Sequence, residues 1–276
     1  MPTAPPRQQP QPPVPLRGVC ATRYVTPLRE GGSLPGLVEA DDLGLYVVKF
    51  RAAGQGVKAL VAEVVAGELA RALDLPVPEL VLVDLDPDLA RAEPDFEVQE
   101  LALASAGVNL GMDYLPGSVT FSPVADTAPS RAPDPVLAAD VVWFDGFVTN
   151  VDRTPRNPNL LVWHRRLHLI DHGAALYVHH SWRDPARHAR GPFAMITDHV
   201  LLPIAGPILE ADDRLADRVD EDLLTAVLAV VPDDWLEGDA TYPDAAAHRR
   251  AYVDYLLTRL QPPRPFVAPA EGARRG

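Results

Sequence analysis

Carboxylate and amide side chains that could do metal chemistry gather in residues 150–173. Apolar residues at helical spacing lead into this stretch, and Pro155 and Pro158 then forbid further helix. Mg²⁺ prefers such oxygen ligands and usually binds together with a phosphate-bearing substrate. A carboxylate that the metal does not use can accept a proton from a hydroxyl nucleophile. The side chains concerned are those of Asp152, Asn157, Asn159 and Asp171.

A hairpin is expected to bring these residues together. Apolar, strand-like segments flank the pair Arg165-Arg166, which predicts an antiparallel hairpin turning at that pair. Such a hairpin pairs Leu160 with Asp171 at a cross-strand distance of about 5 Å. Asp171 is therefore expected at the end of the loop that carries Asp152.

Two strings in this stretch resemble the catalytic and metal-binding segments of HipA-like kinases, which in turn resemble phosphatidylinositol kinases. They read N-V-D-R-T-P-R-N-P-N-L-L-V, from residue 150, and L-I-D-H-G, from residue 169. The resemblance implies ATP and Mg²⁺ as cofactors, Asp152 as catalytic base, and Asn157 and Asp171 as metal ligands. Val151 and His172 depart from the H-R-D and D-F-G spellings of ordinary protein kinases. Asn159 leaves open which amide reaches the metal.

Upstream, short β-strands are expected between residues 22 and 51, joined in part by the segment E-G-G-S-L-P-G. On spacing alone this segment is a Gly-rich hairpin connection. The resemblance implies instead that it covers the phosphates of ATP, with Gly32 and Ser33 contributing. Lys49 ends an apolar strand and is one of two lysines in the chain. By resemblance its ammonium contacts the α and β phosphates and pairs with a carboxylate on the next helix.

That helix is predicted between residues 57 and 75 by its apolar spacing. Glu63 and Glu68 both lie on it, five residues and hence about 140° apart, so they cannot both face Lys49. Periodicity leaves Glu68 on the apolar face and Glu63 at its edge. The resemblance aligns Glu63 with the glutamate of the family's helix, and we choose Glu63 with Glu68 as its rival.

The remaining pattern predicts strands at 79–86 and near 96–103 and a segment at 111–117 between two lobes. By resemblance this segment is the hinge, where the backbone of Met112 to Tyr114 meets the adenine edge. Helices that fill the second lobe are expected near residues 197–205, 220–231 and 244–260.

Composition excludes several classes of protein. The net charge of −13 argues against a nucleic-acid surface, and no apolar run has the length of a membrane span. The start of the sequence lacks the apolar core of a signal peptide, and the single cysteine, Cys20, rules out an internal disulfide. We therefore expect a cytoplasmic protein.

A zinc hydrolase is a rival class, because His164, His168 and His172 are spaced four apart. The residues between them alternate as in a strand, which would place such positions roughly 13 Å apart. A nucleotide-binding or protein-interaction module that transfers no phosphate is the alternative outside the enzymes.

We expect an α+β protein with a protein-kinase-like two-lobe fold: a β-rich N-lobe with one helix, and a mostly helical C-lobe. The N-lobe and hinge would span 21–115 and the C-lobe 116–262, between a disordered Pro-rich arm at 1–20 and a disordered tail at 263–276. The implied activity is transfer of the γ-phosphoryl group of ATP to a hydroxyl acceptor, expected to be Ser or Thr of a protein. A small molecule or lipid is the alternative acceptor, and the sequence gives no oligomeric state.

Overall fold

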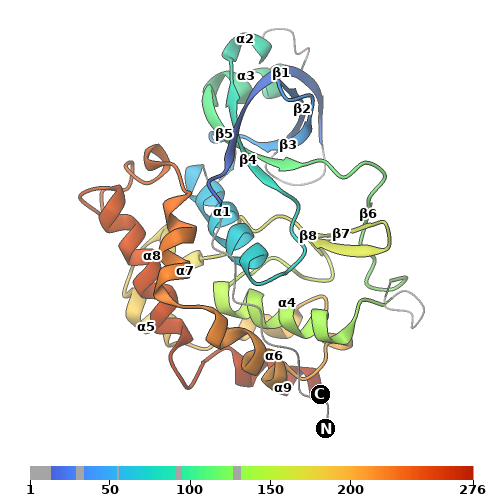
Figure 1. Ribbon diagram of the computed structural model, residues 1–276, viewed down its shortest axis with the longest axis vertical. Coiled ribbons are helices and arrows are strands. Elements are labelled where there is room, and N and C mark those ends of the chain that lie inside the picture. The colour runs from blue at the N-terminus through green and yellow to red at the C-terminus, as the bar shows by residue number, and fades with distance from the viewer. Residues whose placement is uncertain (1–13, 29–33, 55, 91–94, 127–131, 276) are drawn as a thin grey trace.

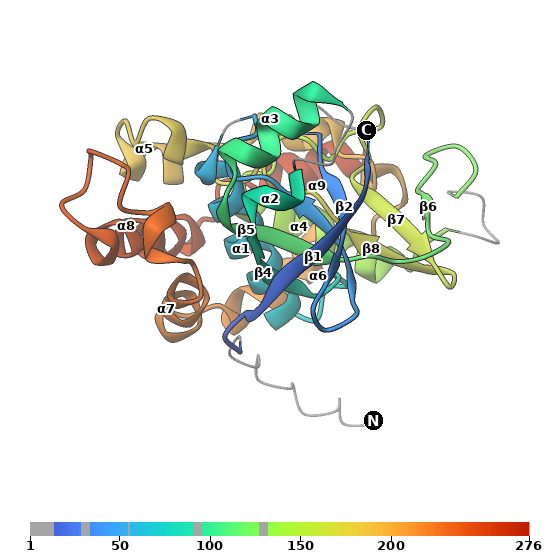
Figure 2. The ribbon, with the colours of Figure 1, turned by 90° about the horizontal axis from the view of Figure 1, so that it is seen from above.

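The computed structural model describes residues 14–28, 34–54, 56–90, 95–126 and 132–275. Five strands form a closed barrel at one end of the molecule, in the order β1-β2-β3-β5-β4 (Figures 1 and 2). All neighbouring strands pair antiparallel except β1 and β4, which pair parallel and close the barrel. The strands are β1 (Arg17–Pro27), β2 (Gly36–Ala40), β3 (Leu45–Lys49), β4 (Leu80–Leu85) and β5 (Gly107–Asp113).

Alternation along β3 decides where Lys49 points. Tyr46 and Val48 are buried in the apolar cluster of the barrel, together with Val81 and Val83 of β4. Because successive side chains of a strand point to opposite faces, Lys49 lies on the other face of the strand. Helix α1 (Val57–Ala72) provides its partner there.

Helix α1 confirms the helix expected after β3. Twelve of its 16 residues are buried, because it packs against β4 on one side and against helix α7 (Glu221–Ala229) on another. Its apolar side chains belong to the large core that also fills the helical end of the molecule. The helix therefore connects the barrel with the helical part.

The segment expected as a strand at 96–103 is helical, so that prediction was wrong. Asp95 accepts a hydrogen bond from the backbone N–H of Glu97 at 3.1 Å and thus caps helix α3 (Phe96–Ala104). Val98 and Ala102, one helical turn apart, are its buried residues. With the short helix α2 (Pro87–Ala90), the barrel end has three helices among the described residues instead of one.

The helical end is built around α4 (Pro135–Val148), ten of whose residues are buried. Helices α6, α8 and α9 pack against it. A small sheet, β6-β7-β8, lies between this end and the barrel (Figure 1). The remaining bounds are β6 (Val119–Thr120), β7 (Leu160–Trp163), β8 (Arg166–Leu169), α5 (Pro185–Ala189), α6 (Ile208–Leu215), α8 (Ala245–Leu260) and α9 (Val267–Arg275), with short 3₁₀ turns at 177–180, 194–198, 202–204, 216–218 and 233–235.

Both ends of the chain differ from expectation. Strand β1 begins at Arg17, inside the segment predicted as a disordered arm. The predicted tail at 263–276 contains α9, which is held in place because Phe266 is fully buried against Trp143 of α4. The helix expected at 197–205 consists of two short 3₁₀ turns instead.

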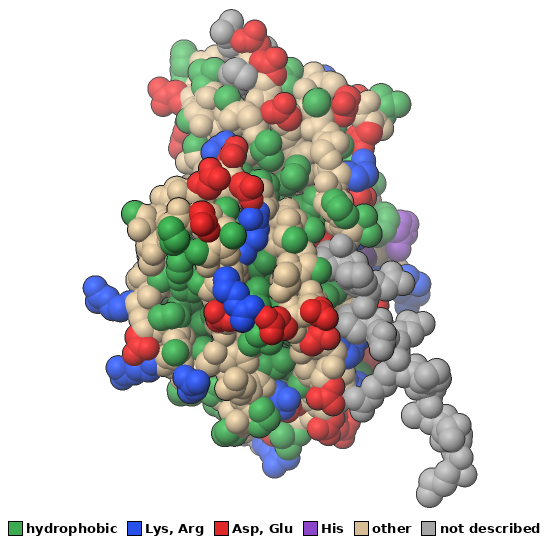
Figure 3. Space-filling view, turned by 60° about the vertical axis from the view of Figure 1, so that its left-hand side comes forward, with side chains coloured by type: hydrophobic (Ala, Val, Ile, Leu, Met, Phe, Trp, Pro, Cys, Tyr) green, Lys and Arg blue, Asp and Glu red, His purple; other side chains and the backbone are tan. Residues whose placement is uncertain are grey.

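Two expectations from composition were that the protein has no nucleic-acid surface and no membrane span, and the surface charges and the helices concern these. On the helical end of the face drawn in Figure 3, Lys and Arg side chains stand singly rather than forming one continuous basic surface. Within the described ranges, no helix is both long and apolar enough to cross a membrane.

Candidate active site

Lys49 is joined to Glu63 by a hydrogen-bonded ion pair, which decides between the two glutamates of α1. Glu68 pairs instead with Arg71 on the same helix, at 3.3 Å. Both glutamates are buried, so burial alone does not distinguish them. Strand β3 directs the side chain of Lys49 toward α1, and the rotation of α1 about its axis turns Glu63, not Glu68, toward Lys49.

Glu63 also binds the backbone of the segment that follows β8. Its carboxylate accepts hydrogen bonds from the N–H groups of His172 and Gly173, at 2.9 and 2.8 Å. A β-carbon on Gly173 would lie only 3.1 Å from Oε1 of Glu63. A side chain at position 173 would therefore crowd this carboxylate.

Asp171 lies on the other side of Lys49, with its Oδ1 atom 2.6 Å from the ammonium nitrogen. Burial opposes the charge on Lys49, but Glu63 and Asp171 outweigh it and hold the pKa of the ammonium above its ordinary value. Burial also opposes the charge on Asp171, yet Lys49 lowers the pKa of this carboxyl to about 2. The structure thus holds an ammonium between two carboxylates.

Asp152 projects from the loop before β7 and is held by the two asparagines of that loop. Asn157 donates to its Oδ2 atom at 2.7 Å and Asn159 at 3.4 Å. Burial raises the pKa of Asp152, the hydrogen bond from Asn159 opposes that shift, and the charge of Asp171 adds to it. A partly desolvated carboxylate with a raised pKa is suited to accept a proton.

One cavity of about 270 Å³ contains these groups. Lys49, Asp152 and Asp171 line it together with Gly54 and other residues of the turn between β3 and α1. The cavity therefore combines a cation for phosphate, a candidate metal ligand and a candidate base.

The hairpin that returns Asp171 to this cavity has a different register from the one predicted. Leu160 pairs with Leu169, and the turn residues are His164 and Arg165, both with positive φ. Two residues at positive φ form the tight turn whose twist matches that of the strands, which fixes this register. Asp171 still reaches the loop, because the N–H of Ile170 donates to the carbonyl of Asn159 at 3.1 Å.

Sequence reasoning missed the buried ion pair beneath the loop. Arg153 lies 2.6 Å from a carboxylate oxygen of Asp145, and His199 contacts the same oxygen at 2.8 Å. Arg153 also donates to the carbonyl groups of Asn159 and Ile170, one on each side of the hairpin. An aspartate in an apolar helical run, eight residues before an arginine, was the available signal.

Several predicted site residues are placed differently or fall outside the described ranges. Gly32 and Ser33 lie outside the described residues. Met112 lies within β5, and Tyr114 directly follows it. The N–H of Tyr114 already donates to the carbonyl of Leu45 at 2.9 Å, which leaves its side chain and carbonyl group for any contact with adenine.

The donor set fits a hard cation. Asp171 offers a carboxylate whose side chain is 42% exposed, and Asn157 directs its amide nitrogen to Asp152, which leaves its amide oxygen as a ligand. Mg²⁺ usually takes only one or two protein carboxylates and completes its shell with phosphates and water. Among the described residues, no three His, Cys, Asp or Glu side chains are grouped to hold a metal ion. His168 lies against Trp163 and His172 against Phe144, which does not support the three-histidine zinc site.

Comparison with known proteins gives a family and a fold. A family model described as HipA-like kinase matches residues 22–264. The crystal structure of the Helicobacter pylori proinflammatory kinase CtkA is similar, with a TM-score of 0.54 and 13% sequence identity, covering 95% of this chain and 98% of that chain. At that identity the likeness concerns the fold alone. Comparison with curated proteins gave no match.

Proposed function

Because the chain belongs to the HipA-like kinase family, we propose that it transfers the γ-phosphoryl group of ATP to a hydroxyl group, with Ser or Thr of a protein as acceptor. One observation carries the proposal: Lys49, Asp152 and Asp171 line a single cavity, with Glu63 holding both Lys49 and the backbone after Asp171. In this proposal the barrel end and the helical end are the two lobes of a kinase.

Lys49 and Asp171 have complementary roles in the proposal. A triphosphate is a stronger partner for an ammonium than one carboxylate, because it offers several charged oxygens. With ATP bound, Lys49 would contact the phosphates, and Asp171 and Asn157 would be the residues that hold Mg²⁺. Mg²⁺ bound there would neutralise charge on the phosphate oxygens. Glu63 keeps Lys49 in place.

In this proposal Asp152 acts on the hydroxyl group that accepts the phosphate. Its carboxylate orients the acceptor hydroxyl and takes its proton, and Asn157 and Asn159 hold that carboxylate in position. The adenine is assigned to the end of β5, near Met112 and Tyr114. A contribution of Gly32 and Ser33 to phosphate binding stays a prediction from the sequence.

The purified protein should release ADP from Mg²⁺-ATP. It should also transfer phosphate groups to itself or to an added protein, each seen as a mass gain of one phosphate. Three acceptors separate the possibilities: dephosphorylated casein, phosphatidylinositol vesicles, and the chain alone. Intact mass spectrometry and phosphosite mapping should place the phosphate on Ser or Thr. Phosphate found only on the lipid would show that the acceptor is a lipid and not a protein. If the protein binds nucleotide but releases no ADP in any of these mixtures, it is a nucleotide-binding module that transfers no phosphate.

A further inference from the structure

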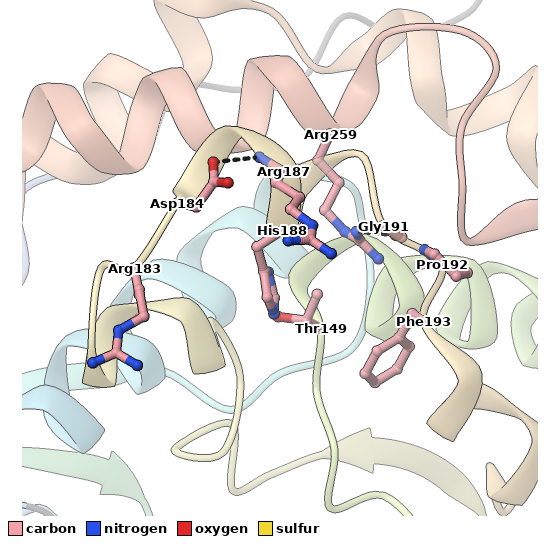
Figure 4. Close-up of a pocket in the computed structure, with 9 residues that line it drawn as sticks. All are labelled: Thr149, Arg183, Asp184, Arg187, His188, Gly191, Pro192, Phe193 and Arg259. Atoms are coloured by element: carbon pink, nitrogen blue, oxygen red, sulfur yellow. Dashed lines mark hydrogen bonds between the residues drawn. The ribbon is translucent and has the colours of Figure 1, made fainter.

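A second pocket, of about 400 Å³, lies in the helical end and shares no lining residue with the cavity around Lys49. Most of its lining comes from α5 and its flanking residues (Figure 4). They lie in the chain between Gly173 and Val200, whose N–H donates to the carbonyl of Arg153 at 3.0 Å. The lining residues are Thr149, Arg183, Asp184, Arg187, His188, Gly191, Pro192, Phe193 and Arg259.

Two exposed arginines of this lining have no partner for their guanidinium groups in the described part of the chain. The hydrogen bonds of Arg183 and Arg187 are made by their backbone N–H groups, to Ser181 and Asp184. Elsewhere in the helical end arginines do find carboxylates, as Arg249 and other residues do at 2.5 to 2.8 Å. With a net charge of −13, the chain does not lack carboxylates. The guanidinium groups of Arg183 and Arg187 are therefore available to a ligand at this pocket.

A third cation forms the inner wall of the pocket. Arg259 is 1% exposed, and its guanidinium donates to the backbone carbonyls of Gly146, Phe147, Ala189 and Gly191. No carboxylate pairs with it among the described residues, and burial lowers its pKa to about 10. The backbone carbonyls and the Phe266 ring, whose centroid lies 5.0 Å from the guanidinium carbon, already hold this side chain in place. Arg259 therefore adds positive charge to the wall of the pocket.

The other lining groups limit what the anion can be. The one carboxylate, Asp184, accepts from the N–H of Arg187 at 3.2 Å and caps α5. His188 bonds the hydroxyl of Tyr255 at 3.0 Å, and burial lowers its pKa. Phe193 adds an apolar wall. Figure 4 shows the side chains of Arg187, His188 and Arg259 converging on the middle of the pocket, with Arg183 at its edge.

We propose that this pocket binds a phosphate monoester, with Arg187 contacting the phosphate oxygens in the middle of the pocket, Arg183 reaching them from its edge, and Phe193 contacting the group that carries the phosphate. Planar guanidinium groups match phosphate oxygens in pairs. The pocket is larger than a bare phosphate ion needs, which favours an ester. The ester is borne either by a phosphorylated side chain or by a small metabolite. The proposal does not depend on phosphoryl transfer by this chain.

Binding can be measured by calorimetry with three probes: a short peptide containing one phosphoserine, the same peptide without phosphate, and glycerol 2-phosphate. The wild-type chain should bind the phosphoserine peptide and glycerol 2-phosphate and should not bind the peptide without phosphate. Replacing Arg183 and Arg187 by Gln should weaken binding by about tenfold for each arginine lost. Tighter binding of the phosphopeptide than of glycerol 2-phosphate identifies a protein-borne ester, and equal or reversed affinities identify a small one.

Two control variants keep the test specific. Arg190→Gln removes an exposed arginine next to α5 but outside the lining, and it should leave the affinity unchanged. Lys49→Met should also leave it unchanged, since the cavity around Lys49 is a separate phosphate site in our account. Circular dichroism and thermal midpoints confirm folding, which exposed Arg→Gln changes should not alter. Failure of the wild type to bind either ester overturns the proposal. Equal losses in Arg190→Gln and in the double variant also overturn it.

Discussion

Glu63 and Gly173 lie 110 residues apart and are joined by a hydrogen bond of 2.8 Å from the glycine N–H to the carboxylate. The same carboxylate holds Lys49. One side chain therefore links strand β3, helix α1 and the backbone that follows Asp171. If the barrel and the helical end move relative to each other, this link sets the arrangement in which Lys49 and Asp171 face one cavity.

Replacing Glu63 by Ala should reduce ADP release by about 100-fold, the loss typical of removing one positioned electrostatic group. Glu68→Ala is the matched control, because Glu68 is a buried glutamate of the same helix that pairs with Arg71 instead. Steady-state rates of both variants at saturating ATP provide the comparison. A larger loss of activity in Glu68→Ala than in Glu63→Ala would contradict the assignment of Glu63 as the functional partner of Lys49.

Gly173→Ala should lower the transfer rate without unfolding the protein. Its β-carbon would come within 3.1 Å of a Glu63 oxygen, so the carboxylate has to move by a few tenths of an ångström, which weakens its hydrogen bonds. Gly238 has open space around the same position and serves as the control for an added methyl group. The check is the rate of ADP release beside the thermal midpoint. Equal rates in both alanine variants would show that the Glu63 to Gly173 contact does not matter for catalysis.

Asp145→Asn should destabilise the protein by roughly 3–5 kcal/mol, because it leaves the Arg153 cation buried without its counter-charge. Glu221→Gln breaks the exposed pair with Arg250, and chemical denaturation should show little change for it. Similar midpoints for the two variants would contradict the assigned role of the buried pair.

The stability that Asp145 contributes should depend on pH in a defined direction. Burial opposes its charge, but Arg153 and then His199 hold its pKa well below the ordinary value. The contribution is thus fully present above the unfolded pKa of about 3.9 and is lost as the pH falls toward the folded value. Wild type and Asp145→Asn should therefore differ most near neutral pH and converge in acid. A gap that widens in acid would contradict this sign.

Asp171→Ala should remove the effect of Mg²⁺ on nucleotide affinity. Titration of a non-hydrolysable ATP analogue, with Mg²⁺ and with a chelator, should give two different affinities for the wild type and one for the variant. The exposed Asp198→Ala controls for the lost negative charge. A Mg²⁺ effect that persists in Asp171→Ala would remove this carboxylate from the metal site.

Sequence reasoning found the polar residues of the site where they interrupt apolar elements. Lys49 ends a strand, Glu63 lies within an apolar helix, and Asp171 follows a strand, so each one stands out against its surroundings. The choice of Glu63 over Glu68 also needed the resemblance, because periodicity alone does not give the rotation of α1 relative to β3. The structure shows that pairing directly.

Features that depend on single backbone conformations or on distant contacts were not predictable. The hairpin register rests on positive φ at His164 and Arg165, two residue types that do not signal such a turn. The 96–103 segment alternates like a strand at its start, and the cap at Asp95 decides for helix. Helix α9 follows a Pro-rich stretch and is fixed by the burial of Phe266, a contact that local sequence does not show.

Asp152→Asn tests the central claim most directly, because it removes the proposed base while keeping the size and most hydrogen bonds of the side chain. We predict that nucleotide affinity stays within a factor of about two, while ADP release and phosphate incorporation fall by at least about 100-fold. Asp234→Asn, an exposed change away from the cavity, should behave as wild type. Transfer at the wild-type rate in Asp152→Asn would contradict the account.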